Sequence, residues 1–348
     1  MGQPSILPSG IVSVLQPQTP PTRAESPARV TRLAPSPTGA LHLGNARTFL
    51  ANWALARQRA WHITLRIEDL DTPRVKPGVI DLTIDLLQWL GIDWDSGPTI
   101  QSHTPAPHIA AMQSLAAQGH IYPSDLTRAQ IEQAASAPQE GAHDIAFPAS
   151  LRPDARPAAF TDTSSSWRFM VNPGPTTFID AFAGPQSFDV SRIVGDFVIW
   201  TKRDTTQPDK TGQPAYQLAV VVDDARQHVT DIVRGDDLLD SAARQLLLYR
   251  ALAFIPEPTY WHLPLVLGED GKRLAKRHGD TRLDTYRAQG VTPQRVIGLI
   301  AHWSGLIPAP RPMPSAEFRE RFNLSMMPHS PARFTPELHQ WLLKKDVS

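Results

Sequence analysis

The sequence contains no cysteine among its 348 residues. Disulfides, a thiolate zinc site and a cysteine nucleophile are therefore excluded. An excess of charge is also missing, because 34 Lys and Arg residues balance 34 Asp and Glu residues. Contact with nucleic acid would thus need a local basic patch and not a globally basic surface. The length is sufficient for one large or two medium domains with a substantial apolar core.

Long hydrophobic runs are absent too, and no stretch approaches the length of a membrane span. The N-terminal segment, residues 1–29, is rich in Pro, Ser and Gln, and no Lys or Arg precedes Arg23. It therefore lacks the basic start and apolar run of a secretory signal. Met1-Gly2 could suggest myristoylation, but Ile6 stands where Ser or Thr is expected. We expect a cytoplasmic protein without membrane contact and with a disordered extension over residues 1–29.

The spacing of apolar residues after this extension predicts an α/β fold. A short strand over 30–33, a Pro/Gly turn, a helix over 41–58 and a strand over 62–67 form the usual start of a parallel sheet with crossover helices. The other predicted elements are helices over 81–90, 104–118 and 241–253, two short strands in 177–190 around a Gly184-Pro185 turn, strands over 197–200 and 216–222 that return to the sheet, a strand over 262–267, and short helices after Gly279. Residues 120–167 read as a peripheral insertion with weak structure.

The first motif joins the first predicted strand to the first helix. Residues 32–45 read RLAPSPTGALHLGN, so the turn brings His42, Gly44 and Asn45 to the helix start. Helix N-termini present unpaired N–H groups that suit phosphate, and glycine lets a nucleotide approach the backbone closely. An isolated His-x-Gly element is more often an ordinary loop with a solvent-facing histidine. The whole string is far more specific than that element.

Two charged motifs follow. Residues 66–71, RIEDLD, place three acids at the end of a strand, where open α/β sheets bind their ligands. These acids could hold an ammonium group or a metal ion, or form a solvated acidic turn. Residues 271–278, GKRLAKRH, place four cations within six residues, which could neutralise a triphosphate and its leaving pyrophosphate. A basic loop that contacts nucleic acid or solvent is the alternative.

Together these motifs resemble the class I aminoacyl-tRNA synthetases. Residues 32–45 resemble their HIGH region, residues 271–277 resemble their KMSKS loop, and RIEDLD is similar to the glutamyl branch. The strings GDFV from Gly195, PAYQLAVVVDD from Pro214 and VRGDDLLDS from Val233 most resemble the glutamyl-Q tRNA(Asp) synthetases, a short branch that lacks the anticodon-binding domain. The resemblance implies a Rossmann-like parallel-sheet catalytic domain over 30–267, with the insertion at about 120–167. A KMSKS-like loop and a mostly helical stem-contact region would follow over 268–348.

The resemblance also implies a role for each matching residue. The glutamate pocket would consist of Arg32, Ala34, Ser36, Glu68, Tyr216 and Arg234, and ATP would lie against His42, Gly44, Asn45, Arg273 and Lys276, with His42 and Lys276 as catalytic residues. The chemistry agrees, because arginine forks satisfy carboxylates and a carboxylate complements an ammonium group. The glutamate α-carboxylate would attack the α-phosphorus of ATP, and an RNA hydroxyl would then take the glutamyl group. Magnesium is expected with ATP, held by phosphates and water.

The implied acceptor is queuosine in the anticodon stem-loop of tRNA(Asp). Charging a tRNA 3′ end would call for a long anticodon-reading region, and only a short tail follows Arg277. A glutamyl-tRNA synthetase that charges the 3′ end is the first alternative. A non-catalytic, RNA-binding paralogue on the same fold is the second. The chain is expected to act as a monomer.

Three departures from the family pattern stand out. Asn45 replaces the second His of the HIGH tetrad, and Arg273 and Ala275 replace Lys and Ser of the KMSKS loop. The family's zinc-binding insertion carries a C-x-C pair where this chain reads Ser124-Asp-Leu126. Histidines 103, 108, 120 and 143 could improvise a site, but solvated histidines are commoner. We expect no structural zinc, and an insertion that is held by packing and Pro-restricted loops or stays partly mobile.

Overall fold

A five-stranded parallel sheet forms the centre of the molecule. The structure is a computed structural model that describes residues 29–39, 41–71, 75–134, 146–202, 212–272, 274 and 281–344. The sheet has the order β11-β10-β1-β2-β3, with β1 (Val30–Leu33), β2 (His62–Ile67), β3 (Ser96–Ile100), β10 (Asp231–Gly235) and β11 (Thr259–Leu263). All four neighbouring pairs are parallel. The predicted α/β class with a parallel sheet is confirmed.

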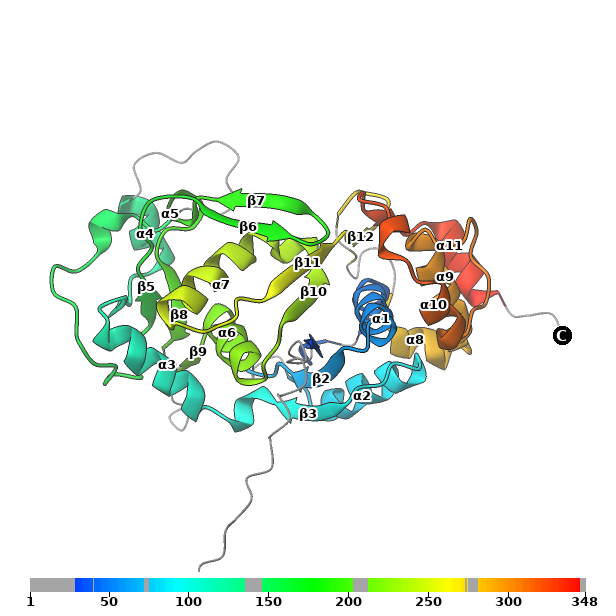
Figure 1. The fold of residues 1–348 in the computed structure, drawn as a ribbon, viewed down its shortest axis with the longest axis horizontal. Coiled ribbons are helices and arrows are strands. Elements are labelled where there is room, and N and C mark those ends of the chain that lie inside the picture. Colours follow the sequence, from blue (N-terminus) through cyan, green and yellow to red (C-terminus); the bar gives the residue numbers. More distant parts are fainter. Residues whose placement is uncertain are drawn as a thin grey trace, which may run out of the picture.

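Helices connect these strands and cover the sheet. Helix α1 (Leu43–Gln58) joins β1 to β2, α2 (Val79–Trp89) joins β2 to β3, and α7 (Leu239–Ala251) joins β10 to β11. In Figure 1, α1 lies between the central sheet and the C-terminal helices. This placement buries α1 on most sides, which explains why its apolar residues include Leu43, Leu50 and Trp53.

A second, antiparallel sheet lies on the side of the central sheet opposite to the C-terminal helices (Figure 1). It has the order β4-β5-β8-β9, with β4 (Ile121–Pro123), β5 (Trp167–Phe169), β8 (Phe197–Thr201) and β9 (Gln213–Pro214). Helices α3 (Ala106–Ala117) and α6 (Tyr216–Arg226) share an apolar cluster with it that contains Trp167 and Phe197. The hairpin of β6 (Thr176–Asp180) and β7 (Gly184–Phe188) lies over α7 and β11. Short helices α4 (Arg128–Ala134) and α5 (Val190–Ile193) complete this part.

Asp196 anchors the insertion to this sheet. Its buried carboxylate accepts hydrogen bonds from Arg152 at 2.7 Å, from the Tyr122 hydroxyl at 2.6 Å and from the Val171 N–H at 2.8 Å. Its backbone carbonyl accepts one from Arg168 at 2.8 Å. A carboxylate that accepts several hydrogen bonds while buried ties its donors into one arrangement. Side chains on β4, on β5 and in the preceding loop are fixed in this way.

The C-terminal part is helical, as predicted. It comprises α8 (Leu283–Ala288), α9 (Pro293–Trp303), α10 (Ser315–Arg321) and α11 (Pro336–Leu343), with a short parallel pair of β12 (Val266–Leu267) and β13 (Ala332–Arg333). One apolar cluster contains Leu50 of α1, Leu299 of α9 and Phe318 of α10. Helices α9 and α10 therefore pack directly on α1, the helix that begins in the HIGH-like string of residues 32–45. Within the described ranges, no helix combines the length and the apolar character needed to cross a membrane.

Four assignments made from the sequence are wrong in detail. Residues 216–222 begin helix α6 and are not a strand, because the buried apolar run over 218–222 carries no period to separate the two. Strand β8, predicted over 197–200, belongs to the antiparallel sheet. The strand predicted over 262–267 ends at Leu263, before a proline, and resumes at Val266. Gly184-Pro185 begins β7, so the hairpin turn precedes it.

Candidate active site

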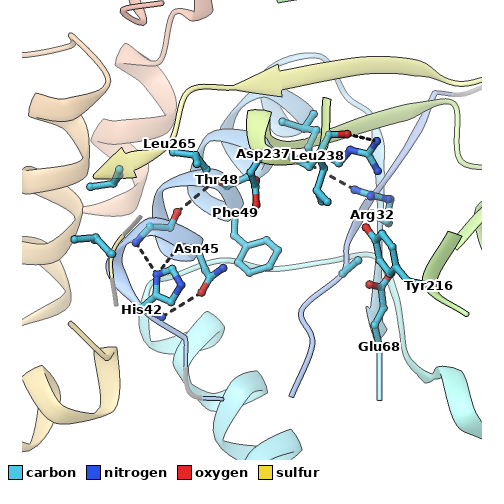
Figure 2. Close-up of a pocket in the computed structure, with 17 residues that line it drawn as sticks. Arg32, His42, Asn45, Thr48, Phe49, Glu68, Tyr216, Asp237, Leu238 and Leu265 are labelled. Atoms are coloured by element: carbon cyan, nitrogen blue, oxygen red, sulfur yellow. Dashed lines mark hydrogen bonds between the residues drawn. The ribbon is translucent and has the colours of Figure 1, made fainter. Parts of the chain in front are cut away.

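A pocket opens at the carboxyl ends of β1, β2 and β10, beside the start of α1 (Figure 2). Eight of the residues predicted from the sequence line it, namely Arg32, Ala34, His42, Gly44, Asn45, Glu68, Tyr216 and Arg234. Ser36 does not; its hydroxyl lies 3.5 Å from the Thr38 hydroxyl in an exposed turn. The predicted Arg273 and Lys276 lie outside the described residues. The topology thus brings together side chains that lie up to two hundred residues apart in the chain.

The pocket has two chemically distinct sides. Figure 2 shows Arg32, Glu68 and Tyr216 together on one side, and His42 with Asn45 on the other. The Phe49 ring projects between them. One side is therefore charged and suited to a small zwitterion, whereas the other is a helix start suited to phosphate.

Buried charges on β2 and α6 organise the first side. Arg66 Nη2 lies 3.0 Å from Glu68 Oε1 and 2.8 Å from Asp224 Oδ1. Arg32 Nε lies 3.4 Å from the same Asp224 oxygen. Burial raises the pKa of Glu68, and the cations of Arg66 and Arg32 oppose that shift. Within the described part of the chain, Glu68 Oε2 accepts no hydrogen bond, so it can receive a ligand ammonium.

Arg234 lies at the end of β10 and is held on three sides. Its Nε donates to His262 Nε2 at 2.9 Å, Nη1 donates to Gln245 Oε1 at 2.9 Å, and Nη2 donates to the Leu238 carbonyl at 3.2 Å. The guanidinium carbon also lies 5.1 Å from the centre of the Tyr260 ring. An arginine has five N–H donors, so one on each terminal nitrogen remains for a carboxylate in the pocket. The fork is therefore fixed before a ligand arrives.

The second side is built by the cap of α1. His42 Nδ1 accepts hydrogen bonds from the Gly44 N–H at 3.1 Å and the Asn45 N–H at 3.3 Å. An imidazole nitrogen that accepts two N–H groups carries no proton, so the ring proton lies on Nε2. A Cβ atom at Gly44 would approach the His42 ring to 3.1 Å, so a larger residue there would require the ring to shift. The Nε2–H group of His42 therefore lies at the start of α1, whose positive end favours an anion.

Sequence reasoning missed several contributors to the site. Phe49 lines the pocket one helical turn after Asn45, and that spacing could have been used to place it. Asp237 also lines the pocket, next to Leu238, from the loop after β10. Asp224 was noted only as part of a motif, although it balances both buried arginines. In the described residues, no three His, Asp or Glu side chains gather where they could hold a metal ion.

The chain matches the family model described as tRNA synthetases class I (E and Q), catalytic domain, over residues 29–338. It is 44% identical to a glutamyl-Q tRNA(Asp) synthetase of Symbiobacterium thermophilum, over 88% of this chain and 96% of that protein. It is 38% identical to a glutamate–tRNA ligase of Synechococcus sp. (strain CC9605), over 76% of this chain and 56% of that protein. The crystal structure of a glutamate-tRNA synthetase from Elizabethkingia anophelis superposes with a TM-score of 0.74 and 26% identity, covering 90% of this chain and 70% of that one. The chain therefore belongs to the class I glutamyl and glutaminyl tRNA synthetase family, in its glutamyl-Q tRNA(Asp) synthetase branch.

Proposed function

We propose that this protein activates glutamate with ATP and transfers the glutamyl group to queuosine in the anticodon of tRNA(Asp). The observation that carries the proposal is the placement of Glu68 and Arg234 in one pocket. Glutamate has an ammonium group and two carboxylates, and these two side chains complement groups of opposite sign. Arg32 adds a second buried cation to the same pocket. A ligand with a single carboxylate could pair with only one of these two arginines.

The ATP triphosphate would lie at the start of α1. Both hydrogen bonds accepted by His42 Nδ1 come from the first turn of the helix, so they polarise the Nε2–H group at the far side of the ring. His42 would thus extend the positive end of the helix toward a phosphate oxygen. The side chain stabilises charge that develops as pyrophosphate leaves and does not need to transfer a proton.

The proposed reaction has two steps. The glutamate α-carboxylate attacks the α-phosphorus, the bond to the bridging oxygen breaks, and pyrophosphate leaves with the bonding electrons. A queuosine hydroxyl then attacks the glutamyl carbonyl carbon, and AMP leaves. We assign Arg273 and Lys276 to the triphosphate on the family pattern alone. The protein mainly positions reactants and stabilises charge.

Magnesium would enter with ATP. Mg²⁺ keeps several waters and is commonly bound through substrate phosphates. We name no protein ligand for it, since the described part of the chain offers no cluster of metal-binding side chains. We also propose that the insertion needs no zinc, because Ser124 and Leu126 stand where thiolates would be required.

The relatives support queuosine over the tRNA 3′ end as the acceptor. The match extends over nearly the whole of the S. thermophilum glutamyl-Q tRNA(Asp) synthetase, but over little more than half of the Synechococcus ligase. Anticodon bases can be splayed out of the stack and read individually. Tyr216 is 41% exposed at the pocket and would meet an incoming base or its hydroxyls.

The test of activation is glutamate-dependent exchange of pyrophosphate into ATP without tRNA. We expect exchange with glutamate and not with aspartate or glutamine, because a shorter or neutral side chain cannot place a second carboxylate against the buried arginines. Arg234→Ala should lower the exchange at least about tenfold, the size expected for a truncated partner of a buried charged pair. Equal exchange with aspartate, or an unaffected Arg234→Ala variant, would contradict the pocket assignment.

A further inference from the structure

We propose that Asp180 and His262 form a positioning pair that holds Arg234 in its ligand-receiving orientation, and that protonation of His262 releases this arginine. The proposal rests on the proposed function, because it takes Arg234 as the residue that receives a glutamate carboxylate. Neither Asp180 nor His262 lines the pocket. Both act through Arg234 and are positioning residues.

Three separate elements supply the chain of contacts. Asp180 ends β6, His262 lies on β11, and Arg234 lies on the neighbouring strand β10. His262 Nδ1 lies 2.6 Å from Asp180 Oδ2, and His262 Nε2 lies 2.9 Å from Arg234 Nε. The side chains of Asp180 and His262 are completely buried. The hairpin that carries Asp180 is therefore coupled to the pocket through one imidazole ring.

The carboxylate of Asp180 is itself held rigidly. Its Oδ1 accepts backbone N–H groups of Phe182 at 2.9 Å, Ala183 at 2.7 Å and His262 at 3.2 Å. Burial opposes ionisation, but the hydrogen bonds from His262 and from these backbone groups lower the pKa of Asp180 overall. Asp180 is therefore a fixed anion whose Oδ2 accepts a hydrogen bond from the His262 ring.

These contacts determine where the imidazole carries its proton. An arginine N–H can only donate, so His262 Nε2 must offer a lone pair to Arg234. The ring proton consequently lies on Nδ1 and is donated to Asp180. A second proton on the ring would place one N–H against another at 2.9 Å and add a positive charge beside the guanidinium. Protonated His262 is thus incompatible with the observed position of Arg234.

The surroundings of His262 favour the neutral ring. Burial is the main cause that lowers the pKa of His262, the charge of Arg234 acts in the same direction, and Asp180 opposes both. Tyr260 is the other titratable group that faces it, with its ring stacked 5.8 Å from the imidazole. The backbone of Leu238, in the segment before α7, also faces His262, and its carbonyl accepts a hydrogen bond from Arg234. Among the described residues, Asp180, Arg234 and Tyr260 are thus the ionisable groups that face this ring.

The test compares the KM for glutamate in pyrophosphate exchange between about pH 7.5 and about pH 4.5, a range that extends below ordinary histidine titration because the pKa of His262 is lowered. The wild type should lose glutamate affinity toward the acid end. His262→Phe keeps the ring volume but removes the acceptor, so it should raise the KM for glutamate about tenfold at pH 7.5 and change the KM for ATP less than about twofold. His262→Gln offers an amide oxygen near the Nε2 position. It should restore the KM to within about threefold and flatten the acid rise.

Matched controls separate this effect from others. His339→Gln, in α11 and bonded to the Tyr286 hydroxyl, should retain the wild-type pH profile. Glu68 also titrates in the pocket, and any acid effect left in His262→Gln belongs to it. If His262→Phe does not fold, His262→Gln and the imidazole nitrogen NMR shifts of the wild type still decide the matter. Those shifts should report a proton on Nδ1 at pH 7.5.

The outcomes also distinguish this proposal from the proposed function. If Arg234→Ala abolishes glutamate activation while His262→Gln keeps the acid rise of the wild type, the positioning pair is wrong and the pocket assignment stands. A proton on Nε2 of His262 would overturn the pair as well. If Arg234→Ala leaves glutamate activation intact, the glutamate pocket itself is wrong.

Discussion

His42 and Asn45 cap the first turn of α1 reciprocally. The Asn45 N–H donates to His42 Nδ1 at 3.3 Å, while the His42 N–H donates to Asn45 Oδ1 at 3.4 Å. Such a capping box satisfies donors at a helix start that would otherwise lack partners. Asn45 stands where the HIGH tetrad has its second histidine. The Asn45 side chain binds the His42 backbone, while the backbone N–H groups of Gly44 and Asn45 fix the tautomer of the His42 ring.

This arrangement allows the structural role of His42 to be separated from its proposed role toward ATP. His42→Asn replaces one capping residue with another, because asparagine is among the best N-caps, but it removes the imidazole N–H donor. We expect the thermal midpoint to change little and kcat/KM for ATP in pyrophosphate exchange to fall roughly 10²-fold, the loss typical of one transition-state donor. His42→Ala removes both the helix cap and the imidazole N–H donor, so the thermal midpoint and kcat/KM for ATP should both fall. A His42→Asn enzyme with normal exchange activity would show that the imidazole does not contact ATP.

We expect the ionised Glu68 side chain to lower the stability of the folded protein while it contributes to glutamate binding. Burial raises the pKa of Glu68, so the folded state holds its proton more firmly than the unfolded state, and the ionised form costs stability at neutral pH. Glu68→Gln removes that cost, while Arg66 keeps Asp224 at 2.8 Å. We expect an unchanged or higher thermal midpoint and a KM for glutamate raised at least about tenfold. Glu132→Gln, in an exposed ion pair with Arg128, is the control that should alter neither quantity. A clear drop in thermal midpoint for Glu68→Gln would refute the cost assigned to its charge.

The buried carboxylate of Asp196 should dominate the stability of the insertion. Asp196→Asn keeps the shape but turns one oxygen into an N–H donor that faces Arg152, Tyr122 or the Val171 N–H. We expect a loss of about 1–3 kcal/mol in the free energy of unfolding, measured in urea. Asp154→Asn, at an exposed site in the same insertion, should stay within about 0.5 kcal/mol of the wild type. Equal effects at both sites would argue against the anchoring role.

The insertion should also be independent of zinc. A structural zinc site needs four ligands, typically Cys or His, and the position of the thiolates holds Ser124 and Leu126. Metal analysis of protein purified without added zinc should find less than stoichiometric zinc. Chelation should leave the thermal midpoint unchanged. One zinc per chain that resists dialysis would contradict this prediction.

The sequence predicted the parts of the fold that carry a period or a dense motif. The helix beginning at Leu43 and the strand ending at Ile67 were placed within two residues, because amphipathic spacing and the Pro/Gly turn both mark them. Residues 216–222 were assigned to a strand, since their continuous apolar run has no period that distinguishes a buried helix. The sheet to which β8 belongs depends on pairings across the chain, which local spacing does not encode.

The residues of the candidate site also divide into those that the motifs predicted and those that only the tertiary structure reveals. Motif positions such as Arg32 and Glu68 were predicted because the resemblance names them, and they do line one pocket. Asp180 and His262, which hold Arg234, could not be predicted from local spacing. They lie 82 residues apart, and only the tertiary placement of the β6 hairpin over β11 brings them together. Ser36 was predicted for the pocket but lies in an exposed turn and does not line it.

The most direct test of the whole account is the position of the transferred glutamyl group. Labelled glutamate, ATP and the enzyme are incubated with tRNA(Asp) that carries or lacks queuosine, and nuclease mapping then locates the label. We expect label in the anticodon fragment of the queuosine-containing tRNA alone, because a queuosine hydroxyl is the proposed nucleophile. Label at the 3′ end, or equal transfer to tRNA without queuosine, would show that the protein is an ordinary glutamyl-tRNA synthetase.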